Sequence, residues 1–128
     1  MGFFDFLKPK FLVRRSLSSV AEQKVILEWQ GIEALKSVGK PSALKEAVIK
    51  ADKLLDFALS QVVSGETLGQ RLKEAKDLFR PTVYDKVWKA HKVRNAMAHE
   101  LNYDPPYFIT KEALDNFKDG FRDLGVRF

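Results

Sequence analysis

The chain has 128 residues, of which 45% are hydrophobic and 30% charged, the balance of one ordinary folded domain with its own core. It contains no cysteine, which excludes disulfides, thiolate catalysis and cysteine-based zinc sites. The net charge of +5 suits a polyanionic partner. No apolar run approaches the roughly 18 residues that span a bilayer, so we expect neither a transmembrane helix nor a secretory leader, and a cytoplasmic location.

Residues 1–17 interleave phenylalanines with basic residues and are expected to form an arm outside the main domain. The arm offers two interpretations. It could anchor to an anionic membrane surface, because apolar rings beside Lys and Arg favour such an interface. The residues that would insert are Phe3, Phe4, Phe6 and Leu7. We favour the other interpretation, an arm that packs on the domain or across a dimer, because Pro9 breaks a helix and the apolar part is short.

Residues 18–128 are expected to form one helical bundle domain, because their apolar residues recur at three- and four-residue spacing and never alternate as in a strand. Gly39 ends the first expected helix and Pro41 begins the second. Pro81 stops the third, and Thr82 and Thr110 cap the last two. The expected helices cover about 19–38, 41–63, 68–79, 82–99 and 110–124. The prediction is an all-α, up-and-down bundle of about five helices.

The stretch from Lys92 to Glu100, at the end of the fourth expected helix, combines a fixed cation, an amide and an imidazole. At 100° per residue, Arg94 falls inside the apolar stripe of this helix. Burying an unpartnered guanidinium would cost several kcal/mol, on the order of ~3 to 5. The sequence therefore predicts that an acidic group meets Arg94, or that this face opens onto a polar cleft or a second subunit. The expected stripe comprises Val83, Tyr84, Val87, Ala90, Ala98 and Leu101.

Positive charge concentrates around this stretch, since residues 66–99 contain eight Lys or Arg against four acidic residues. Residues 100–128 reverse the balance, with four against six. Lys86, Lys89 and Lys92 are therefore candidates for contacting an RNA backbone. The alternative is that these three lysines form an ordinary solvated helix face.

His99 is a candidate general acid or base, because imidazole exchanges protons near neutral pH. A histidine at a helix end can instead hydrogen-bond the last carbonyls. His91 lies on the apolar side of the helix and is expected to be a satisfied core or interface histidine. The two histidines are too few for a metal site, and we expect no metal and no cofactor. Accessory candidates near the motif are Glu100, Tyr103 and His91.

The run Arg94-Asn95-Ala96-Met97-Ala98-His99 resembles the signature of HEPN domains (higher eukaryotes and prokaryotes nucleotide-binding), an Arg and a polar residue followed by a His. The resemblance covers about residues 18–125 and leaves the arm outside. It implies a helical bundle that works as a homodimer, with the motif of each subunit lining one cleft. It also implies a metal-independent endoribonuclease that cleaves RNA by attack of the 2′-hydroxyl, leaving a 2′,3′-cyclic phosphate and a 5′-hydroxyl.

By this resemblance Arg94 stabilises charge on the phosphate, Asn95 orients Arg94 or the substrate, and His99 moves a proton. A role as a toxin with an antitoxin, or with another protein partner, is one setting for such a domain. The toxins paired with nucleotidyltransferase-type antitoxins carry a Tyr two residues after the His, where this chain has Leu101. Two alternatives stay open: a noncatalytic module that binds RNA or a nucleotide, and a membrane-tethered interaction bundle.

Overall fold

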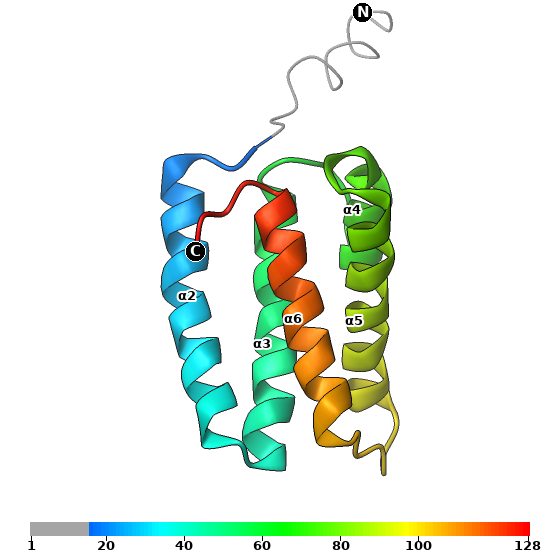
Figure 1. The fold of residues 1–128 in the computed structure, drawn as a ribbon. Coiled ribbons are helices and arrows are strands. Elements are labelled where there is room, and N and C mark those ends of the chain that lie inside the picture. Colours follow the sequence, from blue (N-terminus) through cyan, green and yellow to red (C-terminus); the bar gives the residue numbers. More distant parts are fainter. Residues whose placement is uncertain (1–15) are drawn as a thin grey trace, which may run out of the picture.

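The computed structural model describes residues 16–128, which form five α-helices, one short 3-10 helix and no strand (Figure 1). The prediction of an all-α bundle is therefore confirmed. The helices are α2 (Ser19–Val38), α3 (Pro41–Ser60), α4 (Leu68–Glu74), α5 (Pro81–His99) and α6 (Tyr107–Asp123), with the 3-10 helix η1 (Lys76–Leu78) between α4 and α5. The four long helices run alternately in opposite directions, and α4 lies beside one end of α5 (Figure 1).

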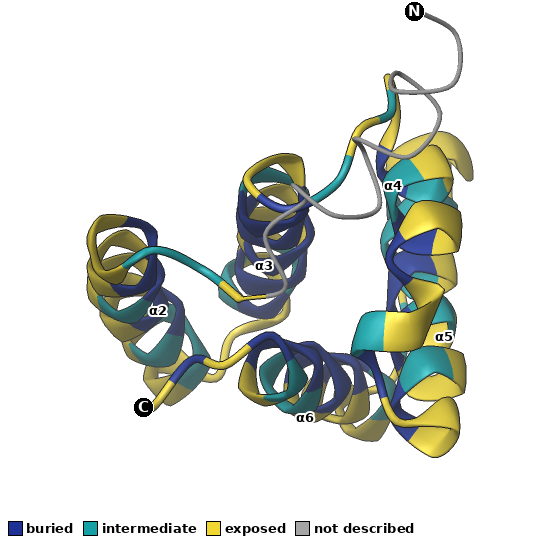
Figure 2. Cartoon of the chain, turned by 90° about the horizontal axis from the view of Figure 1, so that it is seen from above, coloured by how far each residue is buried: buried dark blue, intermediate teal, exposed yellow. Residues whose placement is uncertain are grey.

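The core lies between the inward faces of the long helices, which Figure 2 shows as the dark faces of the cartoon. Helix α3 supplies a continuous buried face because its apolar residues recur every three or four positions. Phe117 and Phe121 of α6 are fully buried. Each such side chain contributes about 2 to 3 kcal/mol through removal of its ring from water. The packing of these faces fixes which way α3 and α5 turn their polar residues.

Close contact between α5 and α6 depends on a glycine. Gly120 of α6 is buried, and a Cβ built on it would lie 2.6 Å from Val87 Cγ2 of α5. No side chain larger than hydrogen fits there without moving one helix or the valine. The Val87 side chain of α5, the helix that carries Arg94, is therefore packed directly against the backbone of α6 at Gly120, which limits the freedom of α5 to shift.

Two predicted helix starts are wrong, and both errors involve proline. Helix α5 begins at Pro81 with Arg80 as its N-cap, not at Thr82, because proline at the first helical position lacks only an N–H that would have no helical partner. Helix α6 begins at Tyr107 after Pro106, not at Thr110. The Thr110 hydroxyl donates instead to the Tyr107 carbonyl, 2.7 Å away.

Two further boundaries differ from expectation. Helix α3 ends at Ser60, where the last helical residues continue as a turn, rather than at Val63. The expected third helix is divided into α4 and η1, and Ala75 between them adopts φ −91° and ψ 6°. By contrast, α2 has its predicted bounds, and Gly39 closes it with φ 73°, a left-handed conformation that glycine adopts without strain.

The chain end is held against the first described helix. Arg127 donates to the Glu22 carboxylate from its backbone N–H at 2.8 Å and from its guanidinium at 3.2 Å. These hydrogen bonds lower the pKa of Glu22 below its ordinary value, with the side-chain hydrogen bond from Arg127 as the main cause. Glu22 is thus held as the carboxylate at neutral pH and ties the residues after α6 to α2.

The residues expected to anchor the arm to a membrane, Phe3, Phe4, Phe6 and Leu7, lie outside the described residues. Across residues 16–128, none of the helices combines the length and apolar character needed to cross a bilayer.

Candidate functional site

The C-terminal half of α5 presents polar side chains on the side that its first half buries. Val83, Val87 and Ala90 are buried as predicted, and His91 follows them into the core. Beyond His91 the helix carries Arg94 and Asn95, both half-buried. Val93 and Met97 still pack against the core, so Arg94 and Asn95 form a polar site beside the continuing apolar contact of α5.

Two members of the expected stripe do not belong to it. Ala98 is exposed, and Leu101 is 97% exposed. Helix α5 ends at His99, and its C-cap Glu100 is already extended, with φ −99° and ψ 116°. A 100° step per residue holds only inside a helix, so it gave the wrong direction for Leu101.

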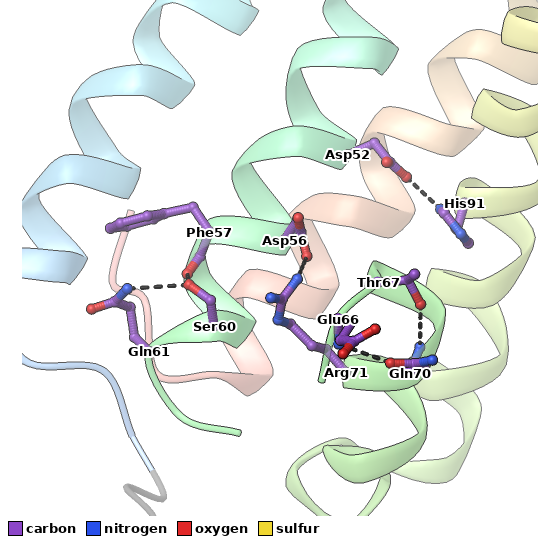
Figure 3. A network of polar contacts seen from close by, with 10 residues as sticks. All are labelled: Asp52, Asp56, Phe57, Ser60, Gln61, Glu66, Thr67, Gln70, Arg71 and His91. Atoms are coloured by element: carbon purple, nitrogen blue, oxygen red, sulfur yellow. Dashed lines mark hydrogen bonds and ion pairs between the residues drawn. The ribbon is translucent and has the colours of Figure 1, made fainter. Parts of the chain in front are cut away.

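The acidic partner that Arg94 requires is Asp52, on the buried face of α3. Its Oδ2 lies 2.6 Å from His91 Nδ1 (Figure 3), and its Oδ1 lies 3.5 Å from Arg94 Nε. Asp52 is 4% exposed and His91 9% exposed, so this contact is shielded from solvent. His91 is thus a buried, hydrogen-bonded histidine, as its position in the sequence indicated.

Asp52 satisfies His91 better than it satisfies Arg94. The Arg94 Nε is buried yet makes no hydrogen bond, because the ion-pair distance of 3.5 Å comes without suitable alignment. Arg94 Nη1 donates to Asn95 Oδ1 at 3.0 Å, and the arginine side chain keeps 32% of its surface exposed. Asn95 therefore holds the guanidinium through Nη1. The N–H donors on the exposed side of the arginine remain accessible to a ligand.

Arg94 lines a groove of about 450 Å³ between α3, α5 and the start of α4. Three segments contribute: Asp52, Lys53 and Asp56 from α3, Thr67, Leu68 and Gly69 from the start of α4, and His91, Arg94 and Asn95 from α5. Two hydrogen bonds fix the loop before α4 (Figure 3). The Thr67 hydroxyl accepts from the Gln70 N–H, and the side-chain oxygen of Gln70 accepts from the Glu66 N–H. Thr67 thus caps α4, and Gln70 in turn accepts from the residue before the cap, a variant of the capping-box pattern.

The groove contains two carboxylates, and both are engaged by cations. Asp56 pairs with Arg71 of α4 at 2.5 Å (Figure 3), and Asp52 contacts both His91 and Arg94. Lys53 is exposed at the groove wall, and the described residues offer it no ion-pair partner. Asp56 is paired with Arg71 and the charge of Asp52 offsets that of Arg94, so the excess positive charge of the groove comes from Lys53, beside the accessible donors of Arg94. An anionic group such as a phosphate suits this balance.

His99 does not line the groove. It is the last residue of α5 and is exposed, and within the described part of the chain it makes no side-chain hydrogen bond or ion pair. A single subunit therefore does not bring Arg94 and His99 together on one side of the groove. The spacing explains the separation, because side chains five residues apart on a regular helix point about 140° away from each other.

The other candidates near the motif also lie outside the groove. Glu100 is exposed and serves as the C-cap of α5, its N–H donating to the Ala96 carbonyl. Tyr103 is half-buried in the following loop, with its N–H donating to the Glu100 carbonyl at 3.2 Å. Neither Glu100 nor Tyr103 makes a hydrogen bond or an ion pair with Arg94, whose described partners are Asn95 and Asp52.

The three lysines expected to contact RNA are exposed on α5 and do not line the groove. Lys89 pairs with Glu112 of α6 at 2.7 Å. Lys86 and Lys92 have no ion-pair partner among residues 16–128. These two lysines keep the strongest case for a contact with an anionic chain, because Lys89 would first have to leave its glutamate.

Asp52, Lys53 and Thr67 are groove residues that the sequence reasoning missed. A signal was present for Asp52, because it immediately follows Ala51 within the stripe that includes Val48 and Leu55. A carboxylate at such a position needs a cationic or hydrogen-bonding partner in the core, and Arg94 needs an acidic one. These two needs together make Asp52 one candidate partner for Arg94, but the sequence does not select it.

In the described residues, no group of three or more His, Asp or Glu side chains gathers closely enough to hold a metal ion. The groove itself brings together the Arg94 guanidinium, the Asn95 amide, the Lys53 ammonium group, the Thr67 hydroxyl, the Asp56 carboxylate and the buried Asp52–His91 pair. Comparison of the chain with known protein families, with characterised proteins and with solved structures finds no match.

Proposed function

We propose that this chain is a metal-independent endoribonuclease of the HEPN type, acting as a homodimer. The observation that carries the proposal is the state of Arg94. It is a half-buried guanidinium that lines a groove and that Asn95 holds through Nη1. Among residues 16–128 its ion-pair partner is Asp52, which makes no hydrogen bond to its buried Nε. Such a fixed cation in partly desolvated surroundings is suited to stabilising charge that develops on a phosphate.

The reaction follows from the chemistry of RNA. The 2′-oxygen forms a bond to phosphorus as the bond from phosphorus to the 5′-oxygen breaks, which gives a 2′,3′-cyclic phosphate and a 5′-hydroxyl. One proton leaves the 2′-hydroxyl and another reaches the departing 5′-oxygen. His99 is the proposed proton carrier for one of these transfers, and Arg94 stabilises the additional negative charge on the phosphate.

A second subunit supplies the histidine that the groove of one subunit lacks, because His99 does not line the groove of its own chain. In a homodimer whose two-fold axis passes near the ends of the two α5 helices, the imidazole of one subunit approaches the guanidinium of the other. Exposed apolar side chains beside the motif, Leu101, Tyr107 and Phe108, provide surface for this contact.

The test uses purified protein, single-stranded RNA and excess EDTA. We expect cleavage by the wild-type protein, loss of at least about 100-fold with Arg94→Ala or His99→Ala, and no cleavage where a 2′-deoxynucleotide replaces the attacking residue. Mixing the Arg94→Ala and His99→Ala proteins should restore part of the activity if each subunit completes the other. Undiminished cleavage by both variants would refute the assignment.

A noncatalytic RNA- or nucleotide-binding module is the second candidate, favoured specifically by the exposure of His99 outside the groove. It predicts salt-dependent binding that Arg94→Ala weakens and His99→Ala leaves unchanged, with no cleavage products. Comparing the two variants in the same binding assay separates the candidates, because only the nuclease requires His99.

A further inference from the structure

Arg94 and three polar side chains around it form a closed circuit of polar contacts. Asp52 Oδ2 lies 2.6 Å from His91 Nδ1, and His91 Nε2 lies 3.4 Å from Asn95 Nδ2. Asn95 Oδ1 accepts from Arg94 Nη1 at 3.0 Å, and Arg94 Nε returns to Asp52 Oδ1 at 3.5 Å. The circuit joins α3 to α5 and leaves Arg94 Nη2 without a hydrogen bond to any residue from 16 to 128.

The hydrogen-bonding capacities of these groups permit one arrangement for a neutral His91. The Asp52 carboxylate only accepts, so His91 Nδ1 carries the proton and His91 Nε2 presents a lone pair. That lone pair requires the Asn95 amide nitrogen, which directs Asn95 Oδ1 to Arg94. Turning the amide over would set an oxygen against the lone pair and an NH₂ group against the guanidinium. The tautomer of His91 thus determines how Asn95 holds Arg94.

We propose that His91 and Asp52 are positioning residues for Arg94. Asp52 sets the tautomer of His91, His91 orients the Asn95 amide, and the amide with the Asp52 carboxylate holds the guanidinium so that Nη2 faces the groove. The free Nη donors then meet a phosphate oxygen without the loss of side-chain freedom that an unrestrained arginine would suffer. The kinetic consequence rests on the proposed nuclease function, whereas the orientation of Arg94 does not.

Three substitutions distinguish this role from simple packing. His91→Gln keeps a donor for Asp52 and an acceptor for Asn95, so it should preserve the circuit. His91→Leu has similar volume and removes both groups. Asp52→Asn retains an acceptor for His91 but places an amide NH₂ near Arg94 Nε, which releases the guanidinium. Thermal unfolding of each variant establishes that it folds before the comparison is made.

The first measurement is independent of activity. The side-chain Nε–H of Arg94, identified by its loss in Arg94→Lys, is followed by ¹⁵N NMR. In the wild-type protein and His91→Gln we expect one sharp, slowly exchanging signal, because this atom is buried. In His91→Leu and Asp52→Asn its exchange with water should accelerate by about tenfold or more. An unchanged signal in both of these folded variants would overturn the proposal.

The second measurement is a double-mutant cycle on RNA cleavage. His91→Leu should lower kcat by about 10- to 100-fold with little change in KM, and it should add almost no loss to Arg94→Ala. If the loss of activity in the double variant equals the product of the two single losses, His91 does not act through Arg94 and the proposal is overturned. If the wild-type protein fails to cleave RNA, the proposed function fails, while the NMR comparison still decides the orientation of Arg94.

Discussion

The contact between α5 and α6 yields a prediction in which two opposing effects can be weighed. Gly120→Ala adds a methyl group that would lie 2.6 Å from Val87 Cγ2, about 1 Å short of an ordinary carbon–carbon contact. Val87 is fully buried and has one strongly preferred rotamer in a helix, so it has little room to turn away. The helices must separate locally to admit the methyl group.

The sizes of two opposing effects decide whether Gly120→Ala stabilises or destabilises the fold. Alanine gains about 1 kcal/mol over glycine in a helix interior, whereas overpacking a tight core costs about 1 to 3 kcal/mol. We expect Gly120→Ala to lower the free energy of unfolding by about 1 kcal/mol. The matched control is Gly31→Ala in α2, where the new methyl group meets nothing within 4 Å and should stabilise the fold by about 0.5 to 1 kcal/mol.

Urea denaturation of the two variants tests this reasoning, with the midpoint shifting in opposite directions and the slope unchanged. Adding Val87→Ala to Gly120→Ala should cost less than Val87→Ala costs alone, because the added methyl group fills part of the space that the valine vacates. If Gly120→Ala stabilises the protein as much as Gly31→Ala does, Val87 does not pack tightly against the backbone of α6 and the reasoning is refuted.

Two other predictions concern charge. The lowered pKa of Glu22 means that its carboxylate stabilises the fold above the ordinary value of 4.5 and that this contribution disappears as the pH falls through the folded-state pKa. The stability difference between wild type and Glu22→Gln should therefore shrink on acidification below pH 4.5, as read from urea midpoints; a pH-independent difference would contradict the role of the Arg127 hydrogen bonds. If Lys86 and Lys92 contact RNA, replacing either with Ala should make the negative slope of log K against log salt shallower by about 0.7, and Lys50→Ala on the outer side of α3 should not. An equal effect of Lys50→Ala would mean that the RNA follows another face.

The positions of the long helices could be predicted because burial imposes a period that the sequence displays. Residues such as Leu55 and Phe117 are buried where the pattern placed them. The helix starts were less predictable, since Pro81 and Pro106 compete with Thr82 and Thr110 for the same function. A threonine is a good N-cap only if no earlier residue has already begun the helix, and the sequence does not rank the two signals.

The candidate site was likewise predictable only in part. The need of Arg94 for an acidic partner followed from its place in the stripe, but the identity of that partner did not. Asp52 is 39 residues from His91 in the sequence, and they meet only because of the rotation of α3 and α5 about their axes. That rotation is set by the packing of many side chains together, including the close contact at Gly120, rather than by any local pattern.

Among residues 16–128, Arg94 Nε is the sole buried side-chain nitrogen or oxygen without a hydrogen bond. An unsatisfied buried donor costs about 1 to 3 kcal/mol, and Asp52 is already satisfied by His91. Arg94→Met should therefore leave the free energy of unfolding unchanged or raise it by about 1 kcal/mol, although it removes an ion pair. Asp52→Leu should lower it by about 3 kcal/mol, because the buried His91 then loses its hydrogen bond and Arg94 its ion pair. Comparable destabilisation by both would mean that Arg94 holds the bundle together. Stability retained in Arg94→Met, together with loss of RNA cleavage or binding, would mean that the chain keeps this cation for the ligand in its groove.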